Sequence, residues 1–174
     1  MLYTRKGDGG TSGLFGTCER FSKREPVYDA LGTLDELVSL LGLCRAYARA
    51  HPCVRTYLQS AQECLFIVQA ELAGAKKSLT KKQVWTIEET IGQIEEKTGN
   101  PHSFIIPGET ELSGWLDYAR AVARRVERTV LNVADTHAVG NETCSYLNRL
   151  SSLLYALARY VAVREHVKER APSY

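Results

Sequence analysis

The sequence predicts an all-α protein, a five-helix bundle that follows a glycine-rich N-terminal arm. Apolar residues recur at three- and four-residue steps in five long segments, which is the spacing of an amphipathic helix. Short connections join these segments, as they do in helix bundles. Residues 1–25, by contrast, have neither helical nor strand periodicity. We therefore expect a single domain over residues 1–174, with the arm at 1–25 and the helices at 26–170.

Length, composition and charge narrow the class of protein. The chain has 174 residues, of which 44% are hydrophobic and 24% charged, enough for one domain with a sizeable core. The net charge of +2 gives no overall attraction to nucleic acid or to an anionic membrane, so an anion site must come from local clustering. No signal peptide or transmembrane run is visible, and we expect a cytoplasmic protein with no membrane partner.

The cysteines and histidines form no recognisable disulfide or metal pattern. The cysteine count is odd and no C-x-x-C pair occurs, which argues against a disulfide framework or a zinc knuckle. The histidines are scattered, without an H-x-x-x-H pair. We expect free thiols in a reducing cytosol and no metal site built from protein side chains. The residues concerned are Cys18, Cys44, Cys53, Cys64, Cys144, His51, His102, His137 and His166.

Prolines mark the first two helices. Apolar residues on one face predict a helix over residues 29–50, with Pro26 as an entry point just upstream. The pair His51-Pro52 interrupts the pattern. Because proline is favoured in the first turn of a helix, Pro52 predicts the start of a second helix, which runs to about residue 75.

Capping residues mark the remaining helices, which are predicted over residues 81–97, 110–135 and 141–167. Thr80 is expected to cap the third helix and Asn141 the fifth, because their side-chain oxygens can accept from free N–H groups of the first turn. Between the third and fourth helices, residues 98–108 form a loop with two prolines and a short apolar centre, Phe104-Ile105-Ile106.

The arm contains the residue types found in phosphate-binding loops. Residues 4–16 read TRKGDGGTSGLFG, in which glycines allow close backbone approach and Lys6, Thr11 and Ser12 add a cation and hydroxyls. The segment is neither a Walker A loop nor a dinucleotide-binding fingerprint, since it lacks G-K-[ST] and a βαβ context. Lys23, just downstream, is a further candidate for phosphate. The alternatives are a flexible tail and a solvated lysine.

The fourth helix carries an arginine face. Arg120, Arg124 and Arg128 are spaced i, i+4, i+8 and therefore stack on one side. Like charges at this spacing cost roughly 0.2–0.5 kcal/mol per pair in an isolated helix. Glu127 lies near Arg124 in sequence and could offset part of the repulsion, and a polyphosphate could offset the rest through forked guanidinium contacts. The alternative is a solvated basic face.

Two further polar positions are candidates. Asn148 lies within an apolar run of the fifth helix, so its amide needs either an inter-helix hydrogen bond or a ligand. Asp35 and Glu36 lie together in the first helix. This acidic pair could favour the helix dipole, or Asp35 could pair with an arginine of the fourth helix.

Six motifs taken together resemble the PduO-type ATP:cob(I)alamin adenosyltransferases. In chain order they are TRKGDGGTSGLFG, ERFSK, ALGTLDEL, FIIPG, ARAVARRVER and YLNRLSSLLYALARY, and they cover about residues 3–165. The resemblance implies a five-helix bundle that forms a homotrimer, with sites between neighbouring subunits. It implies that ATP binds with Mg²⁺ beneath the arm. Reduced cob(I)alamin would attack the ribose 5′ carbon of ATP, giving adenosylcobalamin and triphosphate.

The resemblance also implies roles for individual residues. Asp35 and Arg120 match an ion pair that bridges subunits beside the corrin, and Phe104 matches an aromatic wedge that displaces the lower axial ligand of cobalamin. With Arg124, these residues would act at the reacting centre. The positions that match ATP contacts are Thr4, Arg5, Lys6, Gly7, Ser12, Gly13, Lys23, Arg124, Arg125, Glu127, Arg128 and Asn148.

The chain departs from the family pattern mainly on the corrin side. In the arm, Lys6 and Gly9 stand where threonine and lysine are usual. Glu109 replaces a glycine, and the tail ends early, at Tyr174. In the first helix, an arginine, a tyrosine and an asparagine of the pattern are replaced by Val27, Leu31 and Val38. The phosphate-binding set is therefore closer to the pattern than the corrin-facing set.

Three functions are compared on this basis. The first is the adenosyltransferase, which needs no catalytic base because the nucleophile is the metal of the substrate. The second is a catalytically weak sensor or chaperone of the same fold that binds ATP or adenosylcobalamin. The third is a scaffold that binds nucleic acid through the arginine face. Net charge of +2 and the lack of aromatic platforms beside the arginines argue against the third.

Overall fold

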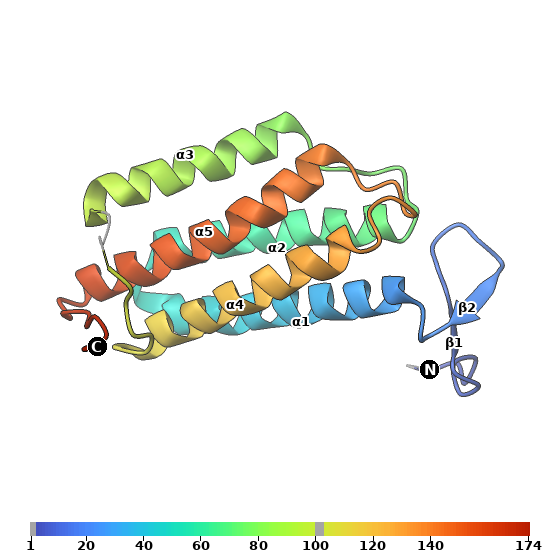
Figure 1. Cartoon of the computed structure of the whole chain (residues 1–174), viewed down its shortest axis with the longest axis horizontal. Coiled ribbons are helices and arrows are strands. Elements are labelled where there is room, and N and C mark those ends of the chain that lie inside the picture. The colour runs from blue at the N-terminus through green and yellow to red at the C-terminus, as the bar shows by residue number, and fades with distance from the viewer. Residues whose placement is uncertain (1–2, 100–102) are drawn as a thin grey trace.

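The computed structural model describes residues 3–99 and 103–174. Five long helices lie along a common axis, as the sequence predicts, and a small hairpin projects from one end (Figure 1). The helices are α1 (Pro26–Tyr47), α2 (Pro52–Leu72), α3 (Lys81–Thr98), α4 (Glu111–Leu131) and α5 (Asn141–Arg164), with a 3₁₀ turn η1 (Ala48–Ala50) and strands β1 (Thr11–Gly13) and β2 (Arg20–Ser22).

The core lies between the packed faces of the helices. The pairs α4–α5, α3–α5, α1–α4 and α1–α2 make the main helix–helix contacts. Each fully buried leucine contributes about 1.5–3 kcal/mol relative to an exposed one. The fully buried leucines are Leu34, Leu37, Leu41, Leu58, Leu65, Leu72, Leu116, Leu147, Leu150, Leu154 and Leu157.

The predicted starts of α2, α3 and α4 agree with the structure to within one residue, whereas α1 begins at Pro26 rather than at residue 29. Pro26 and Pro52 are the first residues of α1 and α2, and Thr80 caps α3 in a capping box. The prediction for Asn141 is wrong, because it is already the first helical residue and Gly140 precedes it without a side-chain cap. The buried carboxylate of Glu71 in α2 replaces the cap. It accepts hydrogen bonds from Gly140 N and Thr143 Oγ1 at 3.0 and 2.5 Å.

The fourth helix ends earlier than predicted, at Leu131 rather than near residue 135. The next residues turn more tightly, because Val133 N donates to the carbonyl of Val130, three residues back, at 3.1 Å. Ala138 then takes a positive φ of 49°. Apolar periodicity continues through this turn, and for that reason the sequence pattern overruns the helix.

The expectation of an irregular arm is partly wrong. Strands β1 and β2 pair antiparallel, with Ser12 opposite Phe21. Each strand has three residues, too few for alternation of apolar and polar side chains to be visible in sequence. No helix among residues 3–99 and 103–174 is long and apolar enough to cross a membrane.

Candidate functional site

The hairpin holds the arm against one end of the bundle. Leu14 and Phe21 of the arm line a cavity of about 450 Å³ with Val27 at the start of α1 and Val133 just after α4. Tyr28 of α1 reaches back to the arm and donates its hydroxyl to the carbonyl of Ser12 at 2.8 Å. The candidate residues Thr4 to Gly13 are therefore carried by a folded loop, which argues against the flexible-tail alternative.

The side chain of Lys23 points into this loop. Its Nζ donates to the carbonyl of Gly7 at 3.1 Å, and its backbone N–H donates to Gly10 at 2.9 Å. A Cβ added at Gly7 would lie 3.0 Å from Lys23 Nζ, so only glycine fits here without a shift. The structure thus brings the predicted phosphate lysine onto the predicted phosphate loop.

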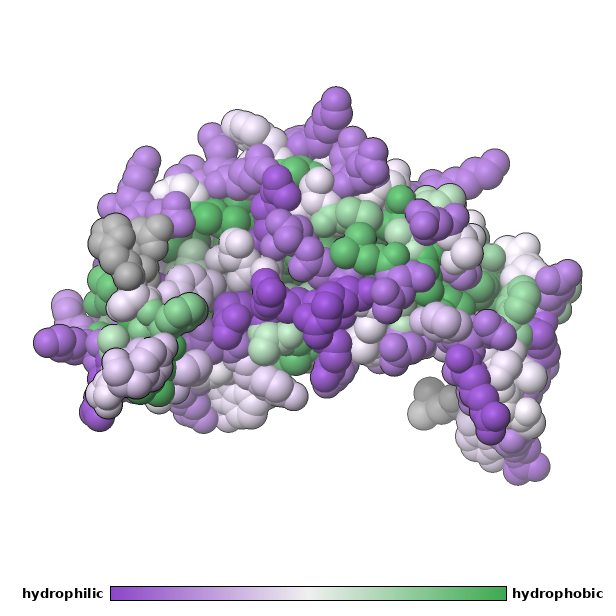
Figure 2. Space-filling view, in the orientation of Figure 1, coloured by the Kyte–Doolittle hydropathy of each residue, from purple (hydrophilic) through white to green (hydrophobic). Residues whose placement is uncertain are grey.

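The arginine face lies on α4, as predicted. Arg124 and Arg128 are exposed, and a hydrophilic band crosses the middle of the molecule over this helix (Figure 2). Arg125 points elsewhere and pairs with Glu36 of α1. Within the chain it is therefore Glu36, and not Asp35, that pairs with an arginine of the fourth helix. Asp35 is exposed and makes no ion pair with any described residue.

Glu127 and Asn148 form an inter-helix bond. Asn148 Nδ2 donates to Glu127 Oε1 at 2.8 Å, which links α5 to α4 beside the arginine face. The inter-helix alternative for Asn148 is thus the one present in the structure. Glu127 makes no ion pair with Arg124 among the described residues, because its carboxylate is turned toward Asn148.

A cavity of about 360 Å³ opens between α3, α4 and α5. Arg120 and Arg124 line it from α4 and Tyr155 and Arg159 from α5, while α3 contributes Glu95. Two of the three arginines predicted to stack on α4 therefore line one concave surface. Such a surface can surround an anion, whereas separate arginines on a convex face would only contact solvent.

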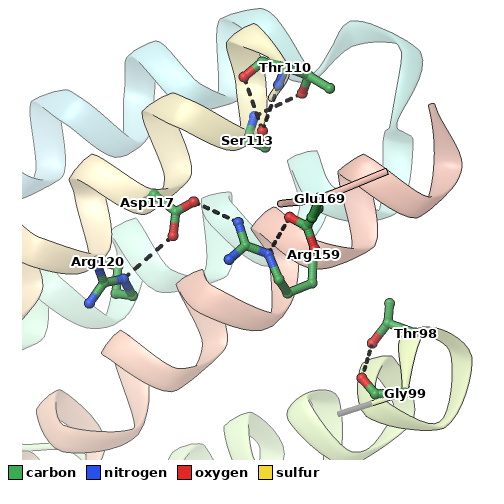
Figure 3. A network of polar contacts seen from close by, with 8 residues as sticks. All are labelled: Thr98, Gly99, Thr110, Ser113, Asp117, Arg120, Arg159 and Glu169. Atoms are coloured by element: carbon green, nitrogen blue, oxygen red, sulfur yellow. Dashed lines mark hydrogen bonds and ion pairs between the residues drawn. The ribbon is translucent and has the colours of Figure 1, made fainter. Parts of the chain in front are cut away.

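Beside this cavity lies a buried ion network that the sequence analysis did not find (Figure 3). Arg159 Nη2 donates to Asp117 Oδ2 at 2.6 Å, and both side chains are at most 4% exposed. Arg159 Nε lies 2.6 Å from Glu169 Oε1, and Arg120 Nε lies 3.5 Å from Asp117 Oδ1. The one sequence signal was an arginine at position 159 within an otherwise apolar stretch of the fifth helix.

Burial and charge act in opposite directions on the pKa values of this network. Burial lowers the pKa of Arg159, but Asp117 and Glu169 outweigh it, so the net shift is upward and the guanidinium stays charged. Burial raises the pKa of Glu169, with further upward contributions from the charges of Asp117 and Glu109, and Arg159 offsets this only in part.

The loop that carries Phe104 is tied to the C-terminal segment. Phe104 is 79% exposed. Two residues later, Ile106 N donates to the carbonyl of Arg170 at 2.8 Å, and Arg170 Nε lies 3.3 Å from Glu109 Oε1. The short tail thus covers the base of this loop, and the departure at Glu109 supplies one of its contacts. His102 of the same loop lies outside the described residues.

The predicted site residues divide into two groups within one chain. The arm lies where α1 begins and α4 ends, whereas the loop that carries Phe104 leads into the start of α4, at the other end of the bundle (Figure 1). A helix of 21 residues such as α4 spans about 30 Å. One chain therefore does not bring Phe104 to its own arm.

The five thiols are free. Cys44 and Cys64 are buried, and burial raises the pKa of Cys44 to about 12, which leaves its thiol protonated and unreactive. Cys18 and Cys53 are exposed.

Comparison with known proteins supplies the family. The family model described as cobalamin adenosyltransferase matches residues 2–161. This chain belongs to the cobalamin adenosyltransferase family. The corrinoid adenosyltransferase PduO of Salmonella typhimurium is 42% identical over 165 residues, which are 91% of this chain and 48% of that protein. A corrinoid adenosyltransferase of Citrobacter freundii is 38% identical, over 91% of this chain and 93% of that protein.

A solved structure agrees with the sequence relatives. A variant PduO-type ATP:corrinoid adenosyltransferase from Lactobacillus reuteri, complexed with cobalamin and ATP, superposes with a TM-score of 0.92 at 26% identity. The match covers 99% of this chain and 96% of that chain. The resemblance drawn from the six motifs is confirmed. The chain spans about half the length of the Salmonella protein, so the cobalamin adenosyltransferase family is shown for this domain-sized region.

Two of the departures in α1 are core residues of this chain. Val27 and Val38 are 4% and 7% exposed and belong to the hydrophobic core. Leu31 is partly buried and packs against that core. The apolar replacements therefore have a structural explanation within the single chain.

Proposed function

We propose that this chain transfers the 5′-deoxyadenosyl group of ATP to the cobalt of a reduced corrinoid, giving an adenosylated corrinoid and triphosphate. The observation that carries the proposal is that a chain of this family has both a folded glycine-rich arm and a cavity lined by Arg120 and Arg124 of α4. The names of the relatives, which are corrinoid adenosyltransferases, and the ligands of the Lactobacillus protein support the same reaction.

The residues suit this chemistry because the protein supplies no nucleophile. Reduced cobalt attacks the ribose 5′ carbon, the bond from that carbon to the triphosphate oxygen breaks, and the triphosphate leaves with its charge. Arg124 and Arg128 would stabilise the leaving triphosphate, and Lys23 with the arm would hold it. Mg²⁺ would be carried mainly by the triphosphate itself, since the described residues include no group of three histidine, cysteine or carboxylate side chains placed to hold a metal.

We propose a homotrimer with each site completed by a neighbouring subunit. The separation of Phe104 from its own arm supports this, because the wedge and the nucleotide would then come from different chains. An aromatic cluster also supports it: the exposed Tyr47 of α1 stacks on the half-buried Trp115 of α4 with ring centroids 6.4 Å apart, and the exposed Tyr118 continues the cluster. The ion pair between Asp35 and Arg120 is proposed to form across the same boundary.

We also propose that residues 1–174 act as one domain in the cytoplasm. The common core of the five helices supports a single domain, and five free thiols support a reducing compartment.

An anaerobic assay tests the function. Purified protein is mixed with chemically reduced cobalamin, Mg²⁺ and ATP, and formation of the cobalt–carbon bond is followed by absorbance while the phosphate product is identified. We expect adenosylcobalamin and intact triphosphate. ATP binding without adenosylcobalamin would contradict the proposal and favour a sensor or chaperone.

A further inference from the structure

One arginine outside the predicted site closes the phosphate-binding loop. Arg20 lies on β2, and its Nη2 donates to the carbonyl of Lys6 at 2.6 Å and to the carbonyl of Thr11 at 2.7 Å. Its Nε donates to Thr11 Oγ1 at 3.0 Å. Lys6 and Thr11 are the two ends of the tight glycine-rich turn, so a single guanidinium joins both ends.

Peptide geometry gives this contact a consequence for ligand binding. A trans peptide is planar, and its C=O and N–H point in opposite directions. Because Arg20 holds the carbonyl of Lys6, the N–H of Gly7 in the same peptide points away from Arg20. This N–H donates to no described residue, whereas the neighbouring Asp8 N–H is used within the loop, on the carbonyl of Arg5 at 3.2 Å. Gly7 thus keeps a fixed and unused donor.

We propose that Arg20 is a positioning residue for the nucleotide: it holds the Lys6–Thr11 loop closed and orients the Gly7 N–H for an anionic oxygen. The inference rests on the proposed function, in which that oxygen belongs to the triphosphate of ATP. Arg20 itself has its Nη2 and Nε on the loop and acts through it rather than on the ligand. Binding then needs no ordering of the loop, and pre-organisation of this kind raises affinity.

The side-chain type matters. Guanidinium carries donors on several nitrogens in a fixed planar fork, and Arg20 uses Nη2 for the two carbonyls and Nε for Thr11 Oγ1. A lysine at position 20 has one nitrogen on a flexible chain, so it should hold the loop less firmly than arginine does. Arg20 is also exposed and outside the core, so its contacts contribute little to global stability.

The test compares Arg20→Ala and Arg20→Lys with Arg24→Ala in the full chain. Arg24 is a matched control, since it is exposed, lies four residues away, and its side chain makes no hydrogen bond or ion pair with described residues. Amide hydrogen exchange of residues 5–13 is measured without nucleotide, followed by the Kd for ATP, kcat at saturating ATP, and Tm.

We expect Arg20→Ala to speed exchange in the loop and to raise the Kd for ATP, each by about 10-fold, because the three exposed hydrogen bonds from Arg20 to the loop are lost. Arg20→Lys should be intermediate. The kcat at saturating ATP and the Tm should stay near the wild-type values, and Arg24→Ala should resemble wild type in every measurement.

Four results would overturn the inference. If the loop exchanges equally slowly in Arg20→Ala and wild type, Arg20 does not hold it. If Arg24→Ala weakens ATP binding as much as Arg20→Ala, general charge rather than positioning is responsible. If the wild-type chain does not bind ATP although loop exchange depends on Arg20, the proposed function fails, and the role of Arg20 in binding fails with it. If the wild-type chain binds ATP and Arg20→Ala binds it equally well, only the role of Arg20 fails.

Discussion

The two ends of the bundle are held together in different ways. At the arm end, cationic side chains such as Arg20 and Lys23 donate to backbone carbonyls in an exposed hairpin. At the opposite end, Asp117 and Arg159 form a buried ion pair that also contacts Glu169 of the C-terminal segment.

The difference indicates how much of the molecule each set of contacts supports. Exposed contacts are individually weak, so losing those of Arg20 or Lys23 should loosen the arm without unfolding the bundle. A buried charge cannot lose its partner cheaply, because it would remain unpaired in a medium of low polarity. We therefore interpret the arm as a locally ordered part of the site and the end with the Phe104 loop as its rigid support.

The largest expected effect comes from breaking the buried ion pair at the rigid end. Asp117→Ala should reduce the free energy of unfolding by about 3–5 kcal/mol, because it leaves Arg159 buried with Glu169 alone. This corresponds to a fall in Tm of about 10 °C for a domain of this size. Glu88→Ala, which removes the exposed pair with Arg149 at 2.9 Å, is the control and should cost about 1 kcal/mol or less. Equal losses in thermal unfolding would contradict the contrast between the ends.

The second effect concerns the arginine surface. Arg124→Ala should weaken ATP handling and lower kcat/KM by about 100-fold, or about 2.7 kcal/mol, because a donor to the departing triphosphate is lost. The Tm should change little, since Arg124 is exposed. Arg164→Ala removes another exposed arginine, at the end of α5, and should keep normal kinetics. Near-normal turnover in Arg124→Ala would contradict the proposed contact between Arg124 and the triphosphate.

The third effect separates corrin from nucleotide. Phe104→Ala should slow transfer by about 10-fold, since the wedge below the corrin is lost, while the Kd for ATP and the Tm stay unchanged. The exposure of Phe104 and its distance from the arm are the reasons. Absorbance spectra of bound cobalamin report whether the lower ligand is displaced. A collapse of ATP binding would instead make Phe104 a structural residue.

The smallest effect is a pH dependence at the rigid end. The pKa of Glu169 is raised above its ordinary value of 4.5 by burial, so the folded chain binds this proton more tightly than the unfolded chain. Its contribution to stability is therefore fully present below pH 4.5 and lost as pH rises through the raised pKa. Glu169→Gln should remove this loss, which denaturant unfolding at several pH values can measure. If Glu169→Gln still loses stability as pH rises, the loss does not come from Glu169.

The sequence predicts those features that depend on local pattern. The five helices follow from apolar periodicity, Pro52 at the first position of α2 follows from the preference of proline for a first turn, and the cap Thr80 follows from its side-chain oxygen. The cap of α5 was missed because it comes from Glu71, 69 residues before Gly140, and no local pattern encodes such a contact.

Sequence chemistry predicts candidate members of the site but not their geometry. Glycines and arginines indicate phosphate binding by their chemistry, but the partners of Glu127 and Arg125 depend on how α4 rotates against α5 and α1. The role inferred for Arg20 depends on a hairpin too short to show periodicity.

The central claim is that a complete site takes its arm from one chain and its Phe104 loop from another. Chains carrying Lys6→Ala with Lys23→Ala are co-expressed with chains carrying Phe104→Ala, and adenosyl transfer by the purified mixture is compared with each parent. With random assembly, about one quarter of the sites would have both parts unmutated. The account predicts activity clearly above both parents. Activity no higher than the mean of the two parents would contradict it and would place each site within a single chain.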